Sequence, residues 1–133
     1  MAEDVRATGF HALAVDLFNG SVATDRDQAR AQTGAVKSDE AGGTISHWVR
    51  WAKVAGNGKT TTLGWCFGGG LSLNTALQND LHAAVIYYGR VTADTAALAK
   101  LQAPLLGHFG TLDKSINPER VGAFQQRLRA AGK

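Results

Sequence analysis

The stretch that most constrains this chain of 133 residues is Gly64-Trp65-Cys66-Phe67-Gly68-Gly69-Gly70. A β-branched run from Thr60 to Leu63 precedes it, and a predicted helix from Leu71 to Gln78 follows it. A strand, a sharp turn and a helix, with the pattern Gly-x-nucleophile-x-Gly at the corner, predict a nucleophile elbow. The alternative is that Cys66 is a small buried hydrophobic residue, the usual place of a lone cysteine.

The elbow pattern has a steric and an electrostatic reason. A strained backbone at the corner lifts the side chain of Cys66 above the sheet. Strand and helix then pass closely at Gly64 and Gly68, which are expected to fit because they carry no Cβ. The amino terminus of the helix directs N–H groups and positive partial charge at the sulfur, which favours the reactive thiolate. The N–H of Phe67 is the expected donor to an oxyanion.

Composition limits the class of protein. A chain of this length predicts a single α/β domain over 1–133, and its 44% hydrophobic content argues against disorder. Lysine and arginine (14) exceed aspartate and glutamate (11) but form no run, so nucleic-acid binding has little support. One cysteine cannot form an internal disulfide, which indicates a cytoplasmic protein. No apolar span of membrane length and no signal peptide is visible.

Apolar runs of strand length alternate with predicted helices along the chain. The expected strands are 10–18, 60–66, 83–88 and 104–109. The expected helices are 1–8, Thr24 or Asp25 to about Val36, Thr44 to about Gly56, 71–78, 92–101, and 118 to about 131, with a polar loop over 38–43. This alternation predicts an α/β fold with about four parallel strands and right-handed crossovers.

A glycine-rich turn, Gly56-Asn57-Gly58-Lys59-Thr60, superficially resembles a phosphate-binding loop. The Walker pattern needs glycine at the position of Lys53, and such a loop follows a strand rather than a helix. A helix that ends in glycine, followed by a tight turn, explains these residues. A flavodoxin-like domain that binds phosphate at Asn19-Gly20-Ser21 is the weakest alternative.

The candidate site residues follow the predicted strands. Sites in parallel sheets lie at the carboxyl ends of the strands, and Cys66, Arg90 and Asp113 each fall just past such an end. Hydrolases with this elbow run nucleophile, acid and histidine in chain order, and Asp113 is in the position of the acid. An ordinary turn aspartate is the alternative interpretation of Asp113.

The four histidines of the chain do not supply the base that this order requires. His11 and His82 lie at the amino ends of their predicted strands, and His47 lies in a predicted helix. His108 lies inside a strand and precedes Asp113, and no histidine follows Asp113. A structural role is the better interpretation of each.

Several stretches resemble the dienelactone hydrolase (carboxymethylenebutenolidase) family, in the same order. They are Val15 to Phe18, Gly56 to Lys59 with Gly64 to Gly69, Ala83 to Gly89, and Phe109 to Asp113. The resemblance implies an α/β-hydrolase fold and a Cys-Asp-His triad that opens esters or lactones through a thiol ester. It implies that Cys66 is the nucleophile and Asp113 the acid. No cofactor or metal is expected.

The chain differs from that family at both ends, and so resembles the middle of its fold. It lacks the N-terminal strands, with a second oxyanion donor and a glutamate that regulates the thiol, and the C-terminal strand, the histidine loop and the last helix. The family arginine that holds a substrate carboxylate falls partly in the lacking sequence. Arg26 and Arg30 lie in the corresponding helix, and Arg90 is placed by position. Arg90, Arg26 and Trp65 are the expected substrate-binding residues.

The expected function is hydrolysis of a small ester or lactone, with low turnover because the triad histidine is absent. The alternative is a non-catalytic scaffold, derived from a hydrolase, that assembles into oligomers. The strands at 10–18 and 60–66 are expected to pair directly, or another copy of the chain fills the gap between them. Exposed strand edges predict a homo-oligomer. Neither nucleic acid nor membrane is an expected partner.

Overall fold

The structure is a computed structural model that describes residues 2–133. Its contacts divide the chain into two compact units, with the boundary between Gly58 and Lys59. Met1, which belongs to the helix predicted over 1–8, lies outside the described residues. No helix within residues 2–133 is both long enough and apolar enough to cross a bilayer.

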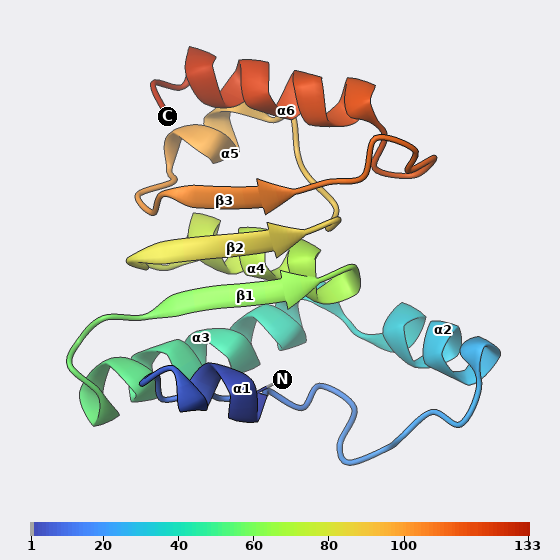
Figure 1. The fold of residues 1–133 in the computed structure, drawn as a ribbon, viewed down its shortest axis with the longest axis vertical. Helices are drawn as coiled ribbons and strands as arrows, with labels where there is room; N and C mark the ends of the chain where they lie inside the picture. The colour runs from blue at the N-terminus through green and yellow to red at the C-terminus, as the bar shows by residue number, and fades with distance from the viewer. Residues whose placement is uncertain (1) are drawn as a thin grey trace. The chain divides into compact units, whose positions relative to one another are not determined.

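The N-terminal unit contains three helices, α1 (Ala2–Ala7), α2 (Arg26–Ala35) and α3 (Ser38–Ala55), shown in Figure 1. The predicted start of α2 is confirmed, because the side chain of Asp25 accepts a hydrogen bond of 2.8 Å from the N–H of Gln28. The loop predicted over 38–43 is wrong, since α3 already begins at Ser38. Two acidic residues, Asp39 and Glu40, favour a helix start there, and Glu40 also pairs with Lys37 at 2.8 Å.

The strand predicted over 10–18 is absent, and its direct pairing with 60–66 is wrong. Residues 10–18 form an irregular segment in which Phe10 is 61% exposed. A strand needs a neighbour for its N–H and C=O groups, and the described part of this unit holds only helices and loops. The carboxylate of Asp16 instead accepts hydrogen bonds from the N–H groups of Phe18 (2.8 Å) and Gly20 (2.6 Å), which closes a turn.

The C-terminal unit is built on a parallel sheet of three strands in the order β1-β2-β3. They are β1 (Thr61–Trp65), β2 (Ala83–Tyr87) and β3 (Leu105–His108). Trp65 pairs with Tyr87, and Tyr87 pairs with His108, so the three strands end level with one another. Figure 1 shows the three arrowheads at the same edge of the sheet. Three of the four predicted strands are therefore confirmed, in the predicted parallel arrangement.

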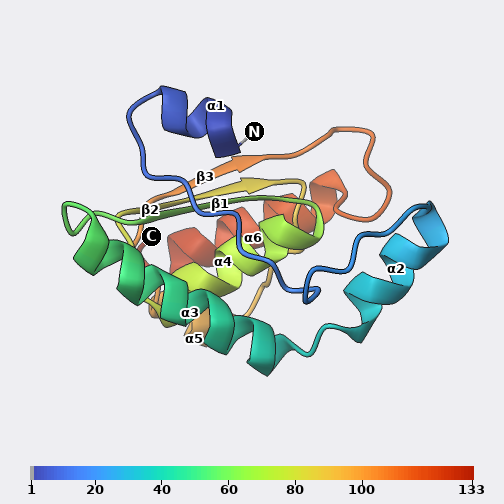
Figure 2. The ribbon, with the colours of Figure 1, turned by 90° about the horizontal axis from the view of Figure 1, so that it is seen from below.

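Three helices lie on one face of this sheet, as Figure 2 shows: α4 (Phe67–Gln78), α5 (Thr95–Ala99) and α6 (Pro118–Ala130). Their shared core contains Leu73, Ile86, Leu98 and Phe124, one residue from each of α4, β2, α5 and α6. Full burial of each such side chain stabilises the fold by about 1.5–3 kcal/mol. The core therefore fixes the three helices against the middle strand.

The caps of these helices explain where they begin. The predicted start of α6 at Pro118 is confirmed, and the side-chain oxygen of Asn117 caps it by accepting a hydrogen bond of 2.9 Å from the N–H of Arg120. The helix predicted over 92–101 does not begin at Thr92: α5 is capped by Asp94, whose carboxylate accepts from the N–H groups of Ala96 and Ala97. An anion at this position also complements the helix dipole, which favours Asp94 over a threonine.

The opposite face of the sheet carries no helix of the C-terminal unit. Side chains alternate between the two faces of a strand, so this open face presents Leu63, Leu106 and the last residue of each strand. Trp65 stacks on Tyr87 with ring centroids 5.3 Å apart, and Tyr87 stacks on His108 at 4.5 Å. A ladder of three rings thus crosses the sheet near its carboxyl edge.

Candidate active site

The predicted sharp turn is present between β1 and α4. Cys66 has φ 54° and ψ −115°, a conformation that costs a non-glycine residue about 1–3 kcal/mol. Its N–H donates to the carbonyl of Tyr87 at 2.9 Å, and its carbonyl accepts from the N–H of Gly70 at 3.2 Å. Cys66 is exposed, so it is not the buried hydrophobic residue of the alternative interpretation.

A glycine is required on the strand side of this turn. A Cβ at Gly64 would lie 2.0 Å from the carbonyl oxygen of Gly68, so strand and helix could not meet with any other residue there. The same prediction for Gly68 is wrong, because a Cβ on Gly68 would meet nothing within 4 Å. The second close approach joins Gly69 to Gly89, where a Cβ on Gly89 would lie 2.3 Å from the carbonyl carbon of Gly69.

Phe67 is the first residue of α4 and follows Cys66 directly. The first N–H groups of a helix have no carbonyl partner within the helix. No side chain caps α4 by a hydrogen bond, so the amino end of this helix is not closed by the residue that precedes it. The first N–H groups of α4 could therefore donate to an oxyanion at Cys66, and the role of the Phe67 N–H stays a prediction.

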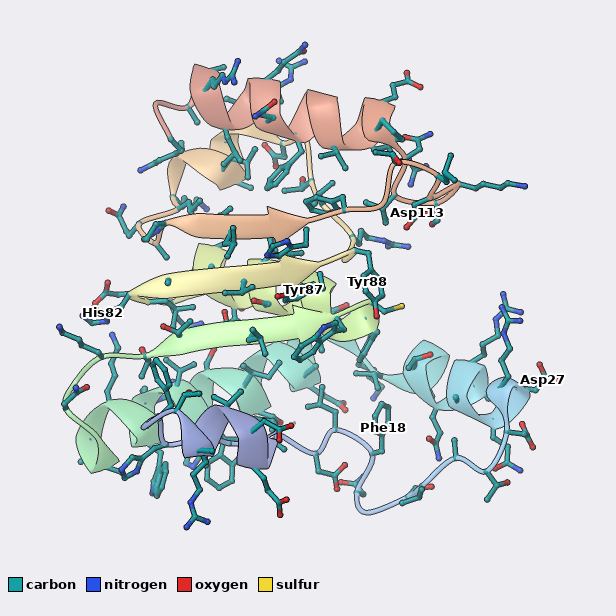
Figure 3. All side chains as sticks on the ribbon, viewed as in Figure 1. Phe18, Asp27, His82, Tyr87, Tyr88 and Asp113 are labelled. Atoms are coloured by element: carbon teal, nitrogen blue, oxygen red, sulfur yellow. The ribbon has the colours of Figure 1, made fainter. Side chains whose placement is uncertain are left out.

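Asp113 lies in the loop that follows β3 and is half-buried. One carboxylate oxygen accepts hydrogen bonds from the N–H groups of Ser115 (2.7 Å) and Ile116 (3.0 Å). These bonds form the turn of the alternative interpretation, and they also hold the carboxylate in place. Figure 3 shows Asp113 beyond the carboxyl end of β3 and Tyr88 beyond that of β2. The structure thus brings Asp113 to the same edge of the sheet as the turn at Cys66.

The three predicted substrate-binding residues have different surroundings. Arg90 is exposed and lies beside the first turn of α4, since its Cβ is 3.5 Å from the place of a Cβ on Gly70. Trp65 is half-buried in the ring ladder on the open face. Arg26 is the exposed first residue of α2, in the N-terminal unit. Only Arg90 and Trp65 therefore belong to the unit that contains Cys66.

Neither histidine of the C-terminal unit lies next to Cys66. His82 is at the amino edge, where its N–H donates to the carbonyl of Thr60 at 2.8 Å. His108 ends β3, is exposed and stacks on Tyr87. Its expected place inside a strand is thus corrected to the carboxyl end. The backbones of β3 and β1 are two strand spacings apart, about 9.6 Å in total. His108 therefore lies on the far side of β2 from the turn at Cys66.

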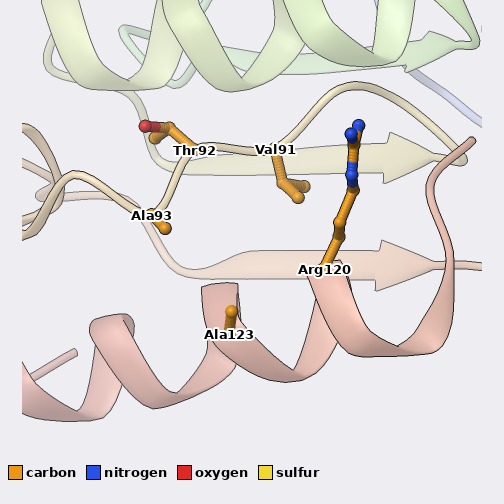
Figure 4. Close-up of a pocket in the computed structure, with 5 residues that line it drawn as sticks. All are labelled: Val91, Thr92, Ala93, Arg120 and Ala123. Carbon is orange, nitrogen blue, oxygen red and sulfur yellow. The ribbon is translucent and has the colours of Figure 1, made fainter.

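A pocket with a volume of about 200 Å³ lies between the loop after β2 and α6, and Figure 4 shows its lining. It is lined by Val91, Thr92, Ala93, Arg120 and Ala123, none of which is a predicted site residue. No group of three or more histidine, cysteine, aspartate or glutamate side chains in residues 2–133 could hold a metal ion.

Tyr88 is a residue at this edge that the sequence analysis missed. It has φ 39°, and its side chain is 45% exposed directly after β2. A bulky residue with positive φ is rare, and such residues cluster at functional sites. No sequence signal marks Tyr88, because the close approach of Gly89 to Gly69 beside it is set by the fold.

The model of the Dienelactone hydrolase family matches residues 1–133. The chain belongs to the dienelactone hydrolase family. A crystal structure titled "Putative Dienelactone Hydrolase", from Klebsiella pneumoniae subsp. pneumoniae MGH 78578, aligns with 87% of the present chain. The TM-score is 0.74 and the sequence identity 26%. The predicted family is thus confirmed, and so is the predicted α/β class, with three strands in place of four.

Two curated relatives of this dienelactone hydrolase family member carry the name "Putative carboxymethylenebutenolidase". The protein from Escherichia coli O157:H7 is 35% identical over an alignment of 99 residues, and the match covers 65% of this chain and 36% of that protein. The protein from Methylorubrum extorquens is 35% identical over an alignment of 98 residues, and the match covers 64% of this chain and 34% of that protein. The chain therefore spans about a third of the length of these relatives, and 55% of the Klebsiella chain.

Proposed function

We propose that this chain is a thiol hydrolase that cleaves a small ester or lactone, with Cys66 as the nucleophile. The observation that carries the proposal is the strained, exposed cysteine at the turn between β1 and α4. A structural cysteine needs neither strain nor exposure, whereas a nucleophile must be exposed to reach a substrate, and backbone strain is concentrated at functional sites. Membership of the dienelactone hydrolase family supports the same class of reaction.

The reaction would have two covalent steps. The Cys66 thiolate attacks the carbonyl carbon, the carbonyl π electrons move to oxygen, and the N–H of Phe67 donates to the oxyanion that results. When the oxyanion collapses, the bond between the carbonyl carbon and the alcohol oxygen breaks, that oxygen takes a proton from water, and a thiol ester remains on Cys66. Water then attacks the thiol ester, which releases the acid and restores the thiol. Arg90, beside the first turn of α4, would pair with a substrate carboxylate.

Among the described residues of the C-terminal unit, this proposed catalyst lacks a histidine in position to act as a general base for Cys66. Asp113 is held at the carboxyl edge as an orienting acid would be, but His108 is stacked on Tyr87, two strands away from β1. Loss of a triad member costs several orders of magnitude in turnover. A cysteine retains some reactivity without a base, because a small fraction is thiolate at neutral pH. We therefore expect acylation to outpace hydrolysis of the thiol ester.

Intact mass spectrometry after exposure to 4-nitrophenyl acetate tests the proposal. The expected result is one acetyl adduct on Cys66 that persists for many minutes, and no adduct on a Cys66→Ala control. Absence of both the adduct and acetate release on the wild-type chain would remove the nucleophile from the proposal. Rapid release of acetate over many turnovers would show that a base acts on Cys66, which contradicts the predicted stalled turnover.

A second candidate function is a scaffold that assembles without catalysis. It is favoured by the open face of the sheet, where Leu63 and Leu106 are exposed on the two outer strands. This candidate predicts that Cys66 reacts with iodoacetamide at the rate of glutathione and that no ester is cleaved. In either case we place the chain in the cytoplasm, because a reducing compartment keeps a single exposed thiol free.

A further inference from the structure

Two strained residues lie at matching positions on neighbouring strands. Cys66 follows Trp65 and Tyr88 follows Tyr87, and Trp65 and Tyr87 are partners in the parallel register. Cys66 and Tyr88 are therefore one strand spacing apart, about 4.8 Å between backbones. Both have positive φ, 54° and 39°. They are the non-glycine residues with this conformation among the described residues of the C-terminal unit.

The backbone around Tyr88 is fixed from two sides. Its N–H donates to the carbonyl of His108 at 2.7 Å, and the carbonyl of Tyr87 accepts from the N–H of Cys66 at 2.9 Å. The next residue, Gly89, is in such close approach to Gly69 that no side chain fits there. These contacts hold Tyr88 in a conformation that a tyrosine rarely adopts by itself.

The strain at Tyr88 is not explained by burial. Its side chain is 45% exposed, whereas Ile86, two residues earlier, is completely buried in the core. An exposed aromatic ring at this edge offers a flat apolar surface of the kind that other rings stack on. The strained backbone therefore holds an exposed aromatic residue one strand spacing from the nucleophile, instead of burying it in the core.

We infer that Tyr88 is a specificity-determining residue, whose ring stacks on an aromatic acyl group that reacts with Cys66. The inference rests on the proposed thiol hydrolase. It assigns to that site a preference for aromatic over small aliphatic acyl groups. Stacking of two rings accelerates the reaction of a matched substrate about threefold to tenfold. The phenol hydroxyl is not required for this role.

The test compares an aromatic and an aliphatic partner for each of two reactions of Cys66. Acylation is measured with 4-nitrophenyl benzoate and 4-nitrophenyl acetate, and alkylation with iodoacetanilide and iodoacetamide. Each aromatic-to-aliphatic rate ratio is divided by the same ratio for glutathione, which removes the intrinsic reactivity of the reagents. The variants are Tyr88→Phe, which keeps the ring, and Tyr88→Asn, since asparagine tolerates positive φ. Circular dichroism shows that each variant is folded.

The expected wild-type ratios exceed that of glutathione about threefold to tenfold. Tyr88→Phe should keep them, and Tyr88→Asn should lower them to the glutathione value. Equal ratios in the wild type and Tyr88→Asn would overturn the inference, as would a wild-type ratio equal to that of glutathione. If neither ester leaves an adduct and neither is turned over, the thiol hydrolase fails, and the alkylation ratio alone then decides whether Tyr88 selects aromatic groups at Cys66.

Discussion

At the scale of single residues, the absence of one Cβ lets a strand and a helix meet at Cys66. The place of a Cβ on Gly64 is 2.0 Å from the carbonyl oxygen of Gly68, far inside van der Waals contact. The reverse is not true, since a Cβ on Gly68 has free space around it. Two glycines that look equivalent in the motif therefore have different physical roles.

This difference gives a matched pair of variants. Gly64→Ala should lower the free energy of unfolding by about 3 kcal/mol, because the overlap is with backbone that cannot rotate away. Gly68→Ala should leave it unchanged or raise it by up to about 1 kcal/mol, because alanine favours the helix. Urea unfolding followed by circular dichroism measures both. Equal losses in the two variants would contradict the steric account.

At the scale of elements, α4 is the part that joins the site to the core. Its first residue follows Cys66, and its Leu73 is 1% exposed against Ile86 of β2. The hydroxyl of Ser72, next to Leu73, also donates to the carbonyl of Val85 (3.0 Å) and lies within hydrogen-bond distance of the hydroxyl of Thr62 (2.9 Å). Both apolar packing and polar contacts therefore set how α4 lies on β1 and β2.

Truncation of Leu73 should be costly. Leu73→Ala removes buried methyl groups from the centre of the C-terminal unit and should lower the free energy of unfolding by about 2–5 kcal/mol. Leu112→Ala is the control, because Leu112 is 92% exposed and its loss should change stability by less than about 0.5 kcal/mol. Thermal and urea unfolding measure the difference. A loss below about 1 kcal/mol for Leu73→Ala would mean that the core does not hold α4 in place.

At the scale of the whole molecule, the open face of the sheet exposes apolar side chains on its two outer strands, β1 and β3. Leu63 on β1 is 44% exposed and Leu106 on β3 is 54% exposed. Outer strands with apolar side chains favour pairing with another chain. We therefore propose, as the sequence predicts, that copies of this chain associate in solution.

Lysine substitutions on this face test the association. Light scattering should give a molar mass above the 14.0 kDa of one chain, rising with protein concentration. Leu63→Lys and Leu106→Lys should each shift the mass toward one chain, because association would bury an unpaired charge. Leu112→Lys, in an exposed loop, should not. A wild-type mass of 14.0 kDa at every concentration would exclude a homo-oligomer.

The local features of this protein can be predicted from short stretches of its sequence. The run from Gly64 to Gly70 predicts the turn, and Asn117-Pro118 predicts the start of α6, because sterics and capping act within a few residues. The alternation of apolar runs and helices predicts the parallel sheet of β1, β2 and β3. Membership of the dienelactone hydrolase family was also visible in the order of these motifs.

Features that depend on distant neighbours follow from the fold and could not be predicted from a local pattern. Residues 10–18 have the apolar pattern of a strand but form none, because a strand exists only where another offers hydrogen bonds. The clash that requires Gly89 comes from Gly69, twenty positions earlier in the chain, and the positive φ of Tyr88 directly precedes that contact. The hydrophobic pattern of a segment indicates which side chains it can bury. Its conformation depends on the segments that it contacts, and the fold sets those contacts.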